Sequence, residues 1–458
     1  MIIAHRINTI EELEKLPKDQ GIEFDVRDSN GVCIVQHDAF KDGILLDDFL
    51  QKVGSRFLIV NIKSEGIEKK VLSLLNEYHL DNFFLLDCSL PKIVELTNQK
   101  ERRIAIRFSE FESIESVLSF RDKVEWVWID CFTHLPLSVE TVKQLKDAGM
   151  KFCLVSPELQ GQPEKIQNYI EQLLLQSIYI DAVCTKYHKK DLWEQYYNRI
   201  RKETGLFICH QGWTDIINSL AFFQYFSRLY KKLYVFIRDD SLHFHRFYTS
   251  QLANIEFICI PLVNNHQSIE YTIKQLRDQE IPLVKDEDMH LIGFDDKNRN
   301  DFYKNAFSDK LANTPFWRNF YTAYDIPFSV RVNYFEIKRD IQAEQKFYAR
   351  IVKQKPYTVT HIIEKSGQPI PLEDLAKIGE GECYELHGLS SSFFEAIEVL
   401  RNAQAMYLID SLWASVCYHL DVKYRYFKDI PITVFCLRNW KGMFIEPVHL
   451  PNWTFIEY

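Results

Sequence analysis

Two carboxylates that share one face of a short apolar segment are the first residues in this chain that could do chemistry. Glu23 and Asp25 are two positions apart, and the residues between and beside them are apolar. On a β-strand this spacing places both carboxylates on the same face. Adjacent carboxylates repel each other unless a proton or a cation shields them, and a divalent metal such as Mg²⁺ or Ca²⁺ is the simplest shield. The pair therefore indicates a metal site, although two acidic residues on a strand more commonly form a solvated face.

Histidines and a basic residue accompany this pair. His5 and Arg6 follow an apolar run at the start of the chain, and His37 follows a turn at 29–31 that could fold it back toward the carboxylates. In phosphodiester chemistry a metal and an arginine neutralise phosphate charge. One histidine removes a proton from water or from a neighbouring substrate hydroxyl, and the other protonates the leaving alkoxide. A lone histidine is more often a surface or packed core residue, so the order of the whole set is what favours a site.

The ordered set resembles the glycerophosphodiester phosphodiesterase family and, more distantly, phosphatidylinositol-specific phospholipase C. The resemblance covers about the first 190 residues and rests on these segments: His5-Arg6-Ile7, Glu23-Phe24-Asp25, His37-Asp38 and the FLIVNIK run at 57–63. It implies a small-molecule phosphodiester as substrate. The roles that it implies are catalysis by His5 and His37, metal ligation by Glu23 and Asp25, and phosphate contacts from Arg6 and Lys63.

The sequence departs from this family's pattern at several positions. Ile7 stands where the family has a glycine, the family's Glu-Asn-Thr after that motif is missing, and Asn61 replaces the glutamate of the third strand. An amide oxygen can coordinate a cation but brings no charge, so we expect a weaker metal site. Asp87 or Asp130 could supply the missing carboxylate, and the sequence does not choose between them.

Eight strand-like runs alternate with amphipathic, helix-like segments over residues 1–190. The runs lie at 2–4, 22–26, 58–62, 83–86, 104–106, 126–129, 152–155 and 182–184. This alternation predicts a (β/α)₈ TIM barrel, in which active sites lie at the carboxyl ends of the strands. Polar residues just past these strands are Lys63, Asp87, Arg107, Asp130, Glu158 and Lys186. Ordinary loop polarity explains part of this pattern, and the mixture of charges favours a site.

The second half of the chain also alternates strand-like and helix-like segments, which predicts a Rossmann-like, doubly wound region. We expect a linker helix over 191–205, one Rossmann-like half over 206–335 and a second over 336–458. Two strand–helix junctions are candidate anion sites, because helix N-termini attract anions. They contain Gly212 with Asp215, and Asp410 with Ser411. A tight turn and a simple helix cap are the commoner interpretations of such junctions.

The tandem halves resemble glycosyltransferases of the GT-B architecture, particularly heptosyltransferase-like and related surface-polysaccharide enzymes. The resemblance rests on the stretch from Gln211 to Asp215, which lacks the family's second glycine, and on a late strand that ends in Asp410-Ser411. It implies a nucleotide-sugar donor bound near Asp410 and Ser411. It also implies contacts to a glycan acceptor near Gly212 and Asp215, whereas no catalytic base can be carried over.

Composition narrows the classes of function. A chain of 458 residues is large enough for two or three domains. The net charge of −9 provides no global basic field for nucleic acid. No apolar run approaches the roughly 20 residues of a membrane span, and the start does not resemble a signal peptide. The ten cysteines lack any C-x-x-C spacing and are typical of reduced thiols. We therefore expect a cytoplasmic protein with at most peripheral membrane contact.

Three hypotheses for function follow. The leading one is a metal-dependent phosphodiesterase fused to a glycosyltransferase, acting in surface-polysaccharide biosynthesis. The alternative is a glycosyltransferase whose phosphodiesterase-like domain is inactive and only binds, which Ile7 and Asn61 favour and the intact histidines and carboxylates oppose. The third makes both halves scaffolds of a polysaccharide complex.

Overall fold

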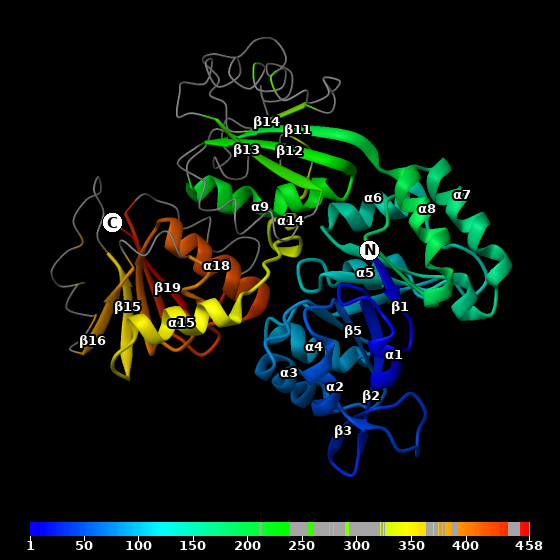
Figure 1. The fold of residues 1–458 in the computed structure, drawn as a ribbon, viewed down its shortest axis with the longest axis horizontal. Coiled ribbons are helices and arrows are strands. Elements are labelled where there is room, and N and C mark those ends of the chain that lie inside the picture. Colours follow the sequence, from blue (N-terminus) through cyan, green and yellow to red (C-terminus); the bar gives the residue numbers. More distant parts are fainter. Residues whose placement is uncertain are drawn as a thin grey trace. The chain divides into compact units, whose positions relative to one another are not determined.

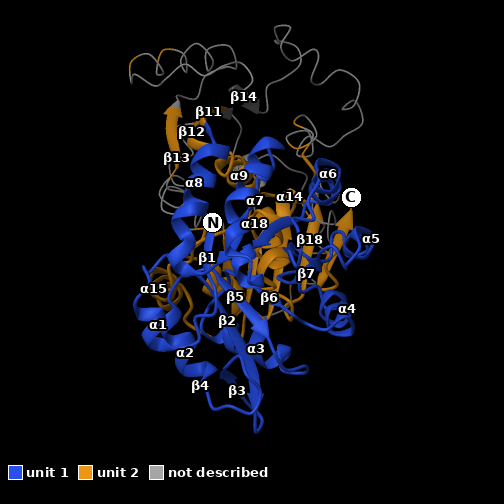
Figure 2. Cartoon of the chain, turned by 90° about the vertical axis from the view of Figure 1, so that its right-hand side faces the viewer, with its two compact units in different colours: residues 1–202 blue, residues 203–458 orange. Residues whose placement is uncertain are grey.

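The chain forms two compact units, Met1–Lys202 and Glu203–Tyr458 (Figure 2). The computed structural model describes residues 1–209, 213–238, 254–260, 289–292, 326–362, 381–386, 393–437 and 449–457, with the single positions 274, 278, 321, 324, 370, 374 and 378. Each unit is described below by itself.

Eight parallel strands organise the first unit, and Figure 1 labels β1, β2 and β5 among them. They are β1 (Ile2–Ala4), β2 (Gly21–Ser29), β5 (Leu58–Ile62), β6 (Phe83–Leu86), β7 (Ala105–Phe108), β8 (Trp126–Ile129), β9 (Lys151–Val155) and β10 (Ala182–Thr185). Parallel ladders join them in the order β6-β5-β2-β1-β10-β9-β8-β7. An isolated parallel bridge from Leu85 to Ile104 brings the two end strands of this order together. All eight predicted strands are therefore present, and they are mutually parallel.

A helix lies between every two successive strands of this set, as the alternation predicts. The helices of this unit are α1 (Ile10–Glu14), α2 (Leu46–Val53), α3 (Glu68–Glu77), α4 (Leu90–Asn98), α5 (Ile114–Leu118), α6 (Val139–Asp147), α7 (Ile166–Leu175) and α8 (Lys190–Ile200), with short 3₁₀ turns at Pro157–Gln160, Pro163–Lys165 and Tyr187–Lys189. Local sequence sets their starts: Thr9 and Glu12 form a capping box on α1, and Ser138 caps α6.

One buried cluster draws side chains from seven of the eight strands. Its members are Ile3, Ile59, Phe84, Leu86, Ala105, Trp126, Trp128, Cys153, Val155, Ala182 and Cys184. The rings of Phe84 and Trp126 lie 5.0 Å apart. Both tryptophans thus pack within this buried cluster. Because side chains alternate along a strand, this packing fixes the strand register and brings the carboxyl ends of the strands to one end of the unit.

A hairpin extends β2 beyond its parallel neighbours. β2 pairs with β3 (Val32–Val35), which pairs in turn with β4 (Ile44–Leu45), both antiparallel. Asn30 and Gly31 have positive φ, as the tightest hairpin turns require. The amide of Gln36 donates to the carbonyl of Asp25 at 3.0 Å. The turn therefore folds the chain back, as expected, and places His37 beside the strand that carries the carboxylates.

The predicted linker helix differs from the structure at both ends. α8 ends at Ile200, and β11 (Lys202–Cys209) starts two residues later. Gly205 is a strand residue in close packing, since a Cβ there would meet Leu233 and Tyr230 at about 3 Å. The hydroxyl of Tyr196 on α8 bonds both Ile178 and Ile180. This helix is therefore the last packed helix of the first unit and not a free connector.

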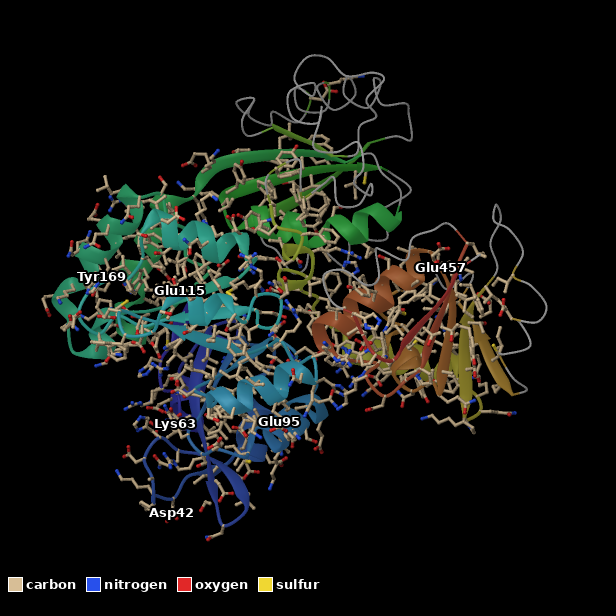
Figure 3. All side chains as sticks on the ribbon, turned by 180° about the vertical axis from the view of Figure 1, so that it is seen from behind. Asp42, Lys63, Glu95, Glu115, Tyr169 and Glu457 are labelled. Carbon is tan, nitrogen blue, oxygen red and sulfur yellow. The ribbon has the colours of Figure 1, made fainter. Side chains whose placement is uncertain are left out.

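The second unit contains two further parallel sheets. The first has the order β13-β12-β11-β14, and the second has the order β16-β15-β17-β18-β19. The elements after β11 are α9 (Trp213–Ser227), β12 (Tyr230–Arg238), β13 (Ile255–Ile260), β14 (Met289–Ile292), α14 (Val330–Asn333), α15 (Ile341–Ile351), β15 (Tyr357–His361), β16 (Glu382–Glu385), α17 (Ile397–Arg401), β17 (Ala405–Ile409), α18 (Leu412–Tyr424), β18 (Ile432–Cys436) and β19 (Trp453–Glu457). β19 ends at Glu457, which is labelled in Figure 3.

One large apolar cluster includes residues from both sheets of this unit. Phe222 of α9, Tyr357 of β15 and Trp413 of α18 all belong to it. Every side chain of α18 from Trp413 to Tyr424 is buried, which explains why this helix shows little amphipathic periodicity. The parallel sheets agree with the α/β prediction for this half.

Candidate functional site

The backbone just after β1 is held in an uncommon conformation. His5 donates its amide to the carbonyl of Thr185 at 3.0 Å. Arg6 has φ +57°, a region that non-glycine residues seldom occupy, and its amide donates to Glu23 Oε2 at 2.6 Å. The following residue is Ile7, whose β-branched side chain disfavours positive φ. The strain is therefore placed at Arg6, where it directs an N–H group toward a buried carboxylate.

Glu23 and Asp25 lie side by side in a buried setting, each with 1% of its surface exposed. Asn61 Nδ2 donates to Glu23 Oε1 at 2.9 Å, and Asn8 Nδ2 donates to Asp25 Oδ2 at 2.8 Å. Burial and the neighbouring Asp25 carboxylate raise the pKa of Glu23 to about 7. The repulsion between the two carboxylates, which their spacing predicts, therefore disfavours ionisation of Glu23.

Two oxygen atoms of this cluster have no hydrogen-bond donor among the described residues. They are Asp25 Oδ1 and Asn61 Oδ1, both buried. Asp25 and Asn61 are register partners on β2 and β5, so a cation between the strands could reach both oxygens and Glu23. Two carboxylates and an amide suit Mg²⁺ or Ca²⁺. Within the described part of the chain, no group of three or more His, Cys, Asp or Glu side chains is arranged to hold a metal ion.

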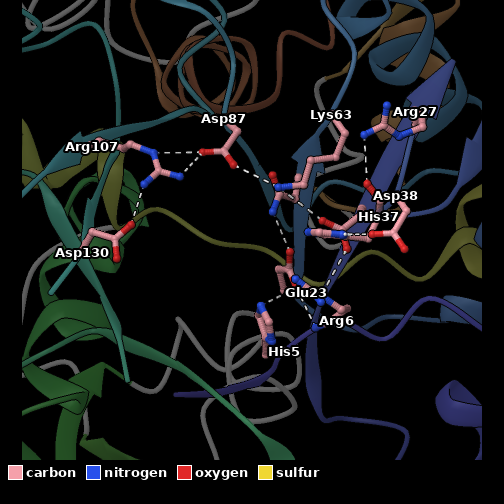
Figure 4. Close-up of polar contacts among 12 residues, drawn as sticks. His5, Arg6, Glu23, Arg27, His37, Asp38, Lys63, Asp87, Arg107 and Asp130 are labelled. Carbon is pink, nitrogen blue, oxygen red and sulfur yellow. Dashed lines mark hydrogen bonds and ion pairs between the residues drawn. The ribbon is translucent and has the colours of Figure 1, made fainter. Parts of the chain in front are cut away.

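Fixed positive charges already approach the carboxylates. Lys63 Nζ lies 3.5 Å from Asp25 Oδ1 and 3.2 Å from Asp87 Oδ2. Asp87 in turn pairs with Arg107 at 2.5 Å, and Arg107 pairs with Asp130 at 2.5 Å. Figure 4 shows this alternating chain of charges running from the carboxylate pair to Asp130. Asp87 and Asp130 therefore hold cationic side chains, and a role for either one as a third metal ligand stays a prediction.

The two histidines occupy different surroundings. His5 Nε2 lies 3.8 Å from Glu23 Oε2. Burial, followed by the positive charge of Arg6, lowers the pKa of His5 to about 4, so its ring is neutral near pH 7. His37 is more exposed, and its Nδ1 contacts Asp38 Oδ1 at 2.8 Å. Arg27 donates to the carbonyl of His37 at 2.9 Å and holds this stretch against β2 (Figure 4).

Asn8 is a site residue that the sequence prediction missed. It accepts from the amide of Asp25 at 2.9 Å while its own amide donates to the carboxylate of Asp25. Asn8 therefore fixes both the backbone amide and the carboxylate of Asp25. No motif marks it, because its importance comes from the close approach of the loop after β1 to β2.

Asp410 and Ser411 lie where the sequence places them, at the end of β17 and the start of α18. Asp410 is buried, and its Oδ1 accepts from the amide of Leu437 at 3.0 Å. Ser411 occupies the N-cap position, but its side chain makes no capping hydrogen bond. The cap interpretation is therefore wrong for the Ser411 hydroxyl, and Asp410 ties two strand ends together.

Two further polar residues lie at the same edge of this sheet. His361 ends β15 and Glu385 ends β16, and their Nδ1 and Oε1 atoms are 3.3 Å apart. Because these strands and β17 are parallel, their carboxyl ends meet at one edge, where doubly wound folds bind ligands. His361 and Glu385 were missed because 24 residues separate them in sequence. Asp215 lies in the first turn of α9, and Gly212 lies outside the described residues.

Comparisons with known proteins gave structural matches only. No family model matches the chain, and no curated protein matches it. It is similar to a glycerophosphodiester phosphodiesterase from Agrobacterium tumefaciens str. C58, with 15% identity, 43% of this chain and 98% of that chain covered, and a TM-score of 0.30.

Two glycosyltransferase structures also match. One is a glycosyl transferase family 9 protein from Veillonella parvula DSM 2008, with 12% identity, 56% and 86% coverage of the two chains and a TM-score of 0.34. The other is the E. coli heptosyltransferase WaaC with ADP-2-deoxy-2-fluoro heptose, with 13% identity, 55% and 92% coverage and a TM-score of 0.31. The matches are thus of both kinds that the sequence resembles. Among the described helices, none is long and apolar enough to cross a membrane.

Proposed function

We propose that the chain is an enzyme with two active sites. In this proposal the first unit is a (β/α)₈ barrel that hydrolyses a glycerophosphodiester-type substrate, and the second is a GT-B-type transferase that uses a nucleotide sugar and a glycan acceptor in surface-polysaccharide biosynthesis. The observation that carries the first assignment is the convergence of His5, Arg6, Lys63 and the buried Glu23–Asp25 pair at the strand ends.

Each residue of the first site has a role in this proposal. Arg6 and Lys63 bind the phosphodiester and stabilise charge on its oxygens. The neutral His5 accepts a proton from water or from a neighbouring hydroxyl of the substrate. His37, oriented by Asp38, donates a proton to the leaving alkoxide. When bound by Glu23, Asp25 and the Asn61 oxygen, a divalent cation supplies further neutralisation of phosphate charge.

One observation favours the alternative of an inactive, binding-only barrel. Asn61 brings no charge, and Lys63 already lies 3.5 Å from Asp25, so the carboxylates are partly neutralised without a metal. Retention of His5 beside Glu23, and of His37 beside Asp38, supports the catalytic version.

For the second unit, the candidate donor site is the carboxyl edge of the sheet that contains β17. Asp410, Ser411, His361 and Glu385 all lie along this edge. A helix N-terminus next to buried polar side chains suits a sugar diphosphate. Acceptor contacts are proposed near Gly212 and Asp215.

Hydrolysis of simple diesters tests the first assignment. Bis(p-nitrophenyl) phosphate and glycerophosphocholine are incubated with the full chain in Mg²⁺, Ca²⁺, Mn²⁺ or chelator, using wild type, His5→Ala and, as a matched control, His449→Ala in the other unit. We expect metal-stimulated turnover that His5→Ala abolishes and His449→Ala retains. Equal turnover in all three proteins would exclude the proposed centre.

A further inference from the structure

The first unit contains a buried carboxylate that the proposed mechanism does not use. Glu158 belongs to the 3₁₀ turn Pro157–Gln160, which follows β9, and only 5% of its surface is exposed. It lies just past the carboxyl end of a parallel strand, as His5 does after β1. Burial of a carboxylate costs free energy unless hydrogen bonds or opposite charges compensate for it. The groups that bind Glu158 therefore indicate its role.

Neutral donors from two strand ends hold the Glu158 carboxylate. Its Oε1 accepts from the hydroxyl of Thr185 at 2.5 Å and from the backbone amide of Lys186 at 3.0 Å. Its Oε2 accepts from the hydroxyl of Ser156, whose oxygen accepts in turn from Nε1 of Trp193 on α8 at 2.9 Å. Hydrogen bonds to an ionised carboxylate are stronger than those between neutral groups. One side chain thus ties together the ends of β9 and β10 and helix α8.

This network leads to the residue that holds His5. Thr185 is the last residue of β10 and the register partner of Ala4 on β1. Its hydroxyl donates to Glu158, while its carbonyl accepts from the backbone amide of His5 at 3.0 Å. The ring of His5 lies beside Glu23 (Figure 4), with Nε2 3.8 Å from Oε2. Glu158 therefore restrains the strand end to which the backbone of His5 is bonded, and it acts on His5 through Thr185.

The backbone next to His5 needs such a restraint. Arg6 has positive φ and donates its amide to Glu23. An uncommon backbone conformation of this kind persists only where the surrounding structure fixes it. Glu23 holds the segment from β2, and Thr185 holds it from β10. The hydrogen bonds of Glu158 thus support the second of these two attachments, on the segment that carries the proposed base.

We propose that Glu158 is a positioning residue of the first site, which acts through Thr185 to hold the main chain of His5 and so keeps its ring in place for the reaction. The inference rests on the proposed hydrolysis, in which His5 accepts a proton, and it assigns no chemical step to Glu158. Glutamine at position 158 can make the same contacts, because its oxygen accepts from Thr185 and Lys186 while its amide donates to Ser156. The hydrogen-bond geometry, and not the negative charge, should therefore be what the site requires.

Steady-state kinetics of the full chain on glycerophosphocholine test this role. Glu158→Ala should lower kcat about tenfold to 10²-fold, because a catalytic group is misplaced, and should leave KM within about twofold of wild type. Glu158→Gln should keep most of the wild-type kcat. Thr185→Val, which keeps the carbonyl and removes one donor, should give a smaller loss than Glu158→Ala and serves in both measurements if Glu158→Ala does not fold.

Glu110→Ala is the matched control. Glu110 lies in the loop after β7, and its carboxylate also ties loops together by accepting from neutral groups, the backbone amides of Phe132, Thr133 and His134. We expect wild-type kinetics in Glu110→Ala. Equal losses in Glu110→Ala and Glu158→Ala would mean general loosening of the loops, and equal losses in Glu158→Gln and Glu158→Ala would mean that the charge acts directly. Either result, or wild-type kcat in Glu158→Ala, would overturn the inference.

Hydrogen exchange at the His5 amide separates this inference from the proposed activity. Protein labelled with ¹⁵N-histidine gives backbone signals for its 14 histidines, and the signal of His5 is identified by its loss in His5→Asn. Exchange in Glu158→Ala should be about tenfold faster than in wild type or more, because the bond to the Thr185 carbonyl opens more often. Glu158→Gln and Glu110→Ala should match wild type. Faster exchange in Glu158→Ala alone supports the inference even if no diester is hydrolysed, and an unchanged rate contradicts it even if glycerophosphocholine is hydrolysed.

Discussion

Both units have polar side chains at the carboxyl ends of parallel strands. The two units differ in how many charged side chains lie close together there. In the first unit Glu23 and Asp25 are buried together and surrounded by Arg6, Lys63 and further ion pairs. In the second, Asp410 bonds a backbone amide, and His361 pairs with Glu385 in a partly exposed setting. Concentrated, opposed charges are typical of sites that change a substrate covalently. The contrast favours catalysis in the first unit, whereas the edge proposed for donor binding in the second unit has fewer opposed charges.

Among the changes that test this comparison, removal of either histidine should have the largest effect on activity. His5→Ala and His37→Ala should each lower kcat for diester hydrolysis by about 10²- to 10⁴-fold, the usual contribution of a general acid or base. Initial rates with glycerophosphocholine provide the measurement. Thermal unfolding should match wild type, because His37 is partly exposed and His5 makes its fold contact through the backbone.

A substitution in the buried interior of the first unit should have a large effect on stability. Trp126→Ala removes a ring that is 1% exposed and packed against Phe84, and should lower the free energy of unfolding by about 3–5 kcal/mol. Denaturant titration followed by circular dichroism measures the change. Phe111→Ala, an exposed aromatic, is the matched control and should stay within about 0.5 kcal/mol of wild type. Similar losses for both variants would contradict the described core.

Lys63 connects the carboxylates to the ion pairs, and its loss should have an intermediate effect. Lys63→Ala should lower kcat/KM for the diester by about 10²-fold, because a fixed positive charge near the phosphate is removed. Lys63→Arg should recover part of this loss. Asp87→Asn, which weakens the 3.2 Å contact to Lys63, should reduce kcat/KM less than Lys63→Ala does. A larger loss in Asp87→Asn would mean that Asp87 acts directly.

Asn61→Asp should give the smallest change and the most specific one. The new carboxylate would lie beside Glu23, where Asn61 now donates a hydrogen bond, so like charges repel until a divalent cation binds. Titration calorimetry should therefore show Ca²⁺ or Mg²⁺ affinity raised by about tenfold, with lower thermal stability in chelator. Unchanged affinity in Asn61→Asp would place any metal elsewhere.

Much of the first site follows from local sequence rules. The alternation around Glu23 and Asp25 fixes their common face, and the turn before His37 fixes its return to β2. The ion pairs of Asp87 and Arg107 depend on strand order, which no local pattern contains. Asn8 depends on how one loop crosses β2.

The second unit was harder to predict for a related reason. The pairing of His361 with Glu385 requires β15 to lie beside β16, and the sequence gives the two strands without their order. The predicted linker helix over 191–205 extends past the end of α8 at Ile200, because Gly205 lies in close packing within β11.

The most direct test of two separate centres is the initial rate of glycerophosphocholine hydrolysis by the full chain as wild type, His5→Ala and Asp410→Asn. Wild type and Asp410→Asn should hydrolyse the diester at equal rates, and His5→Ala should be inactive. Equal rates in all three proteins, or loss in Asp410→Asn alone, would contradict a phosphodiester centre in the first unit.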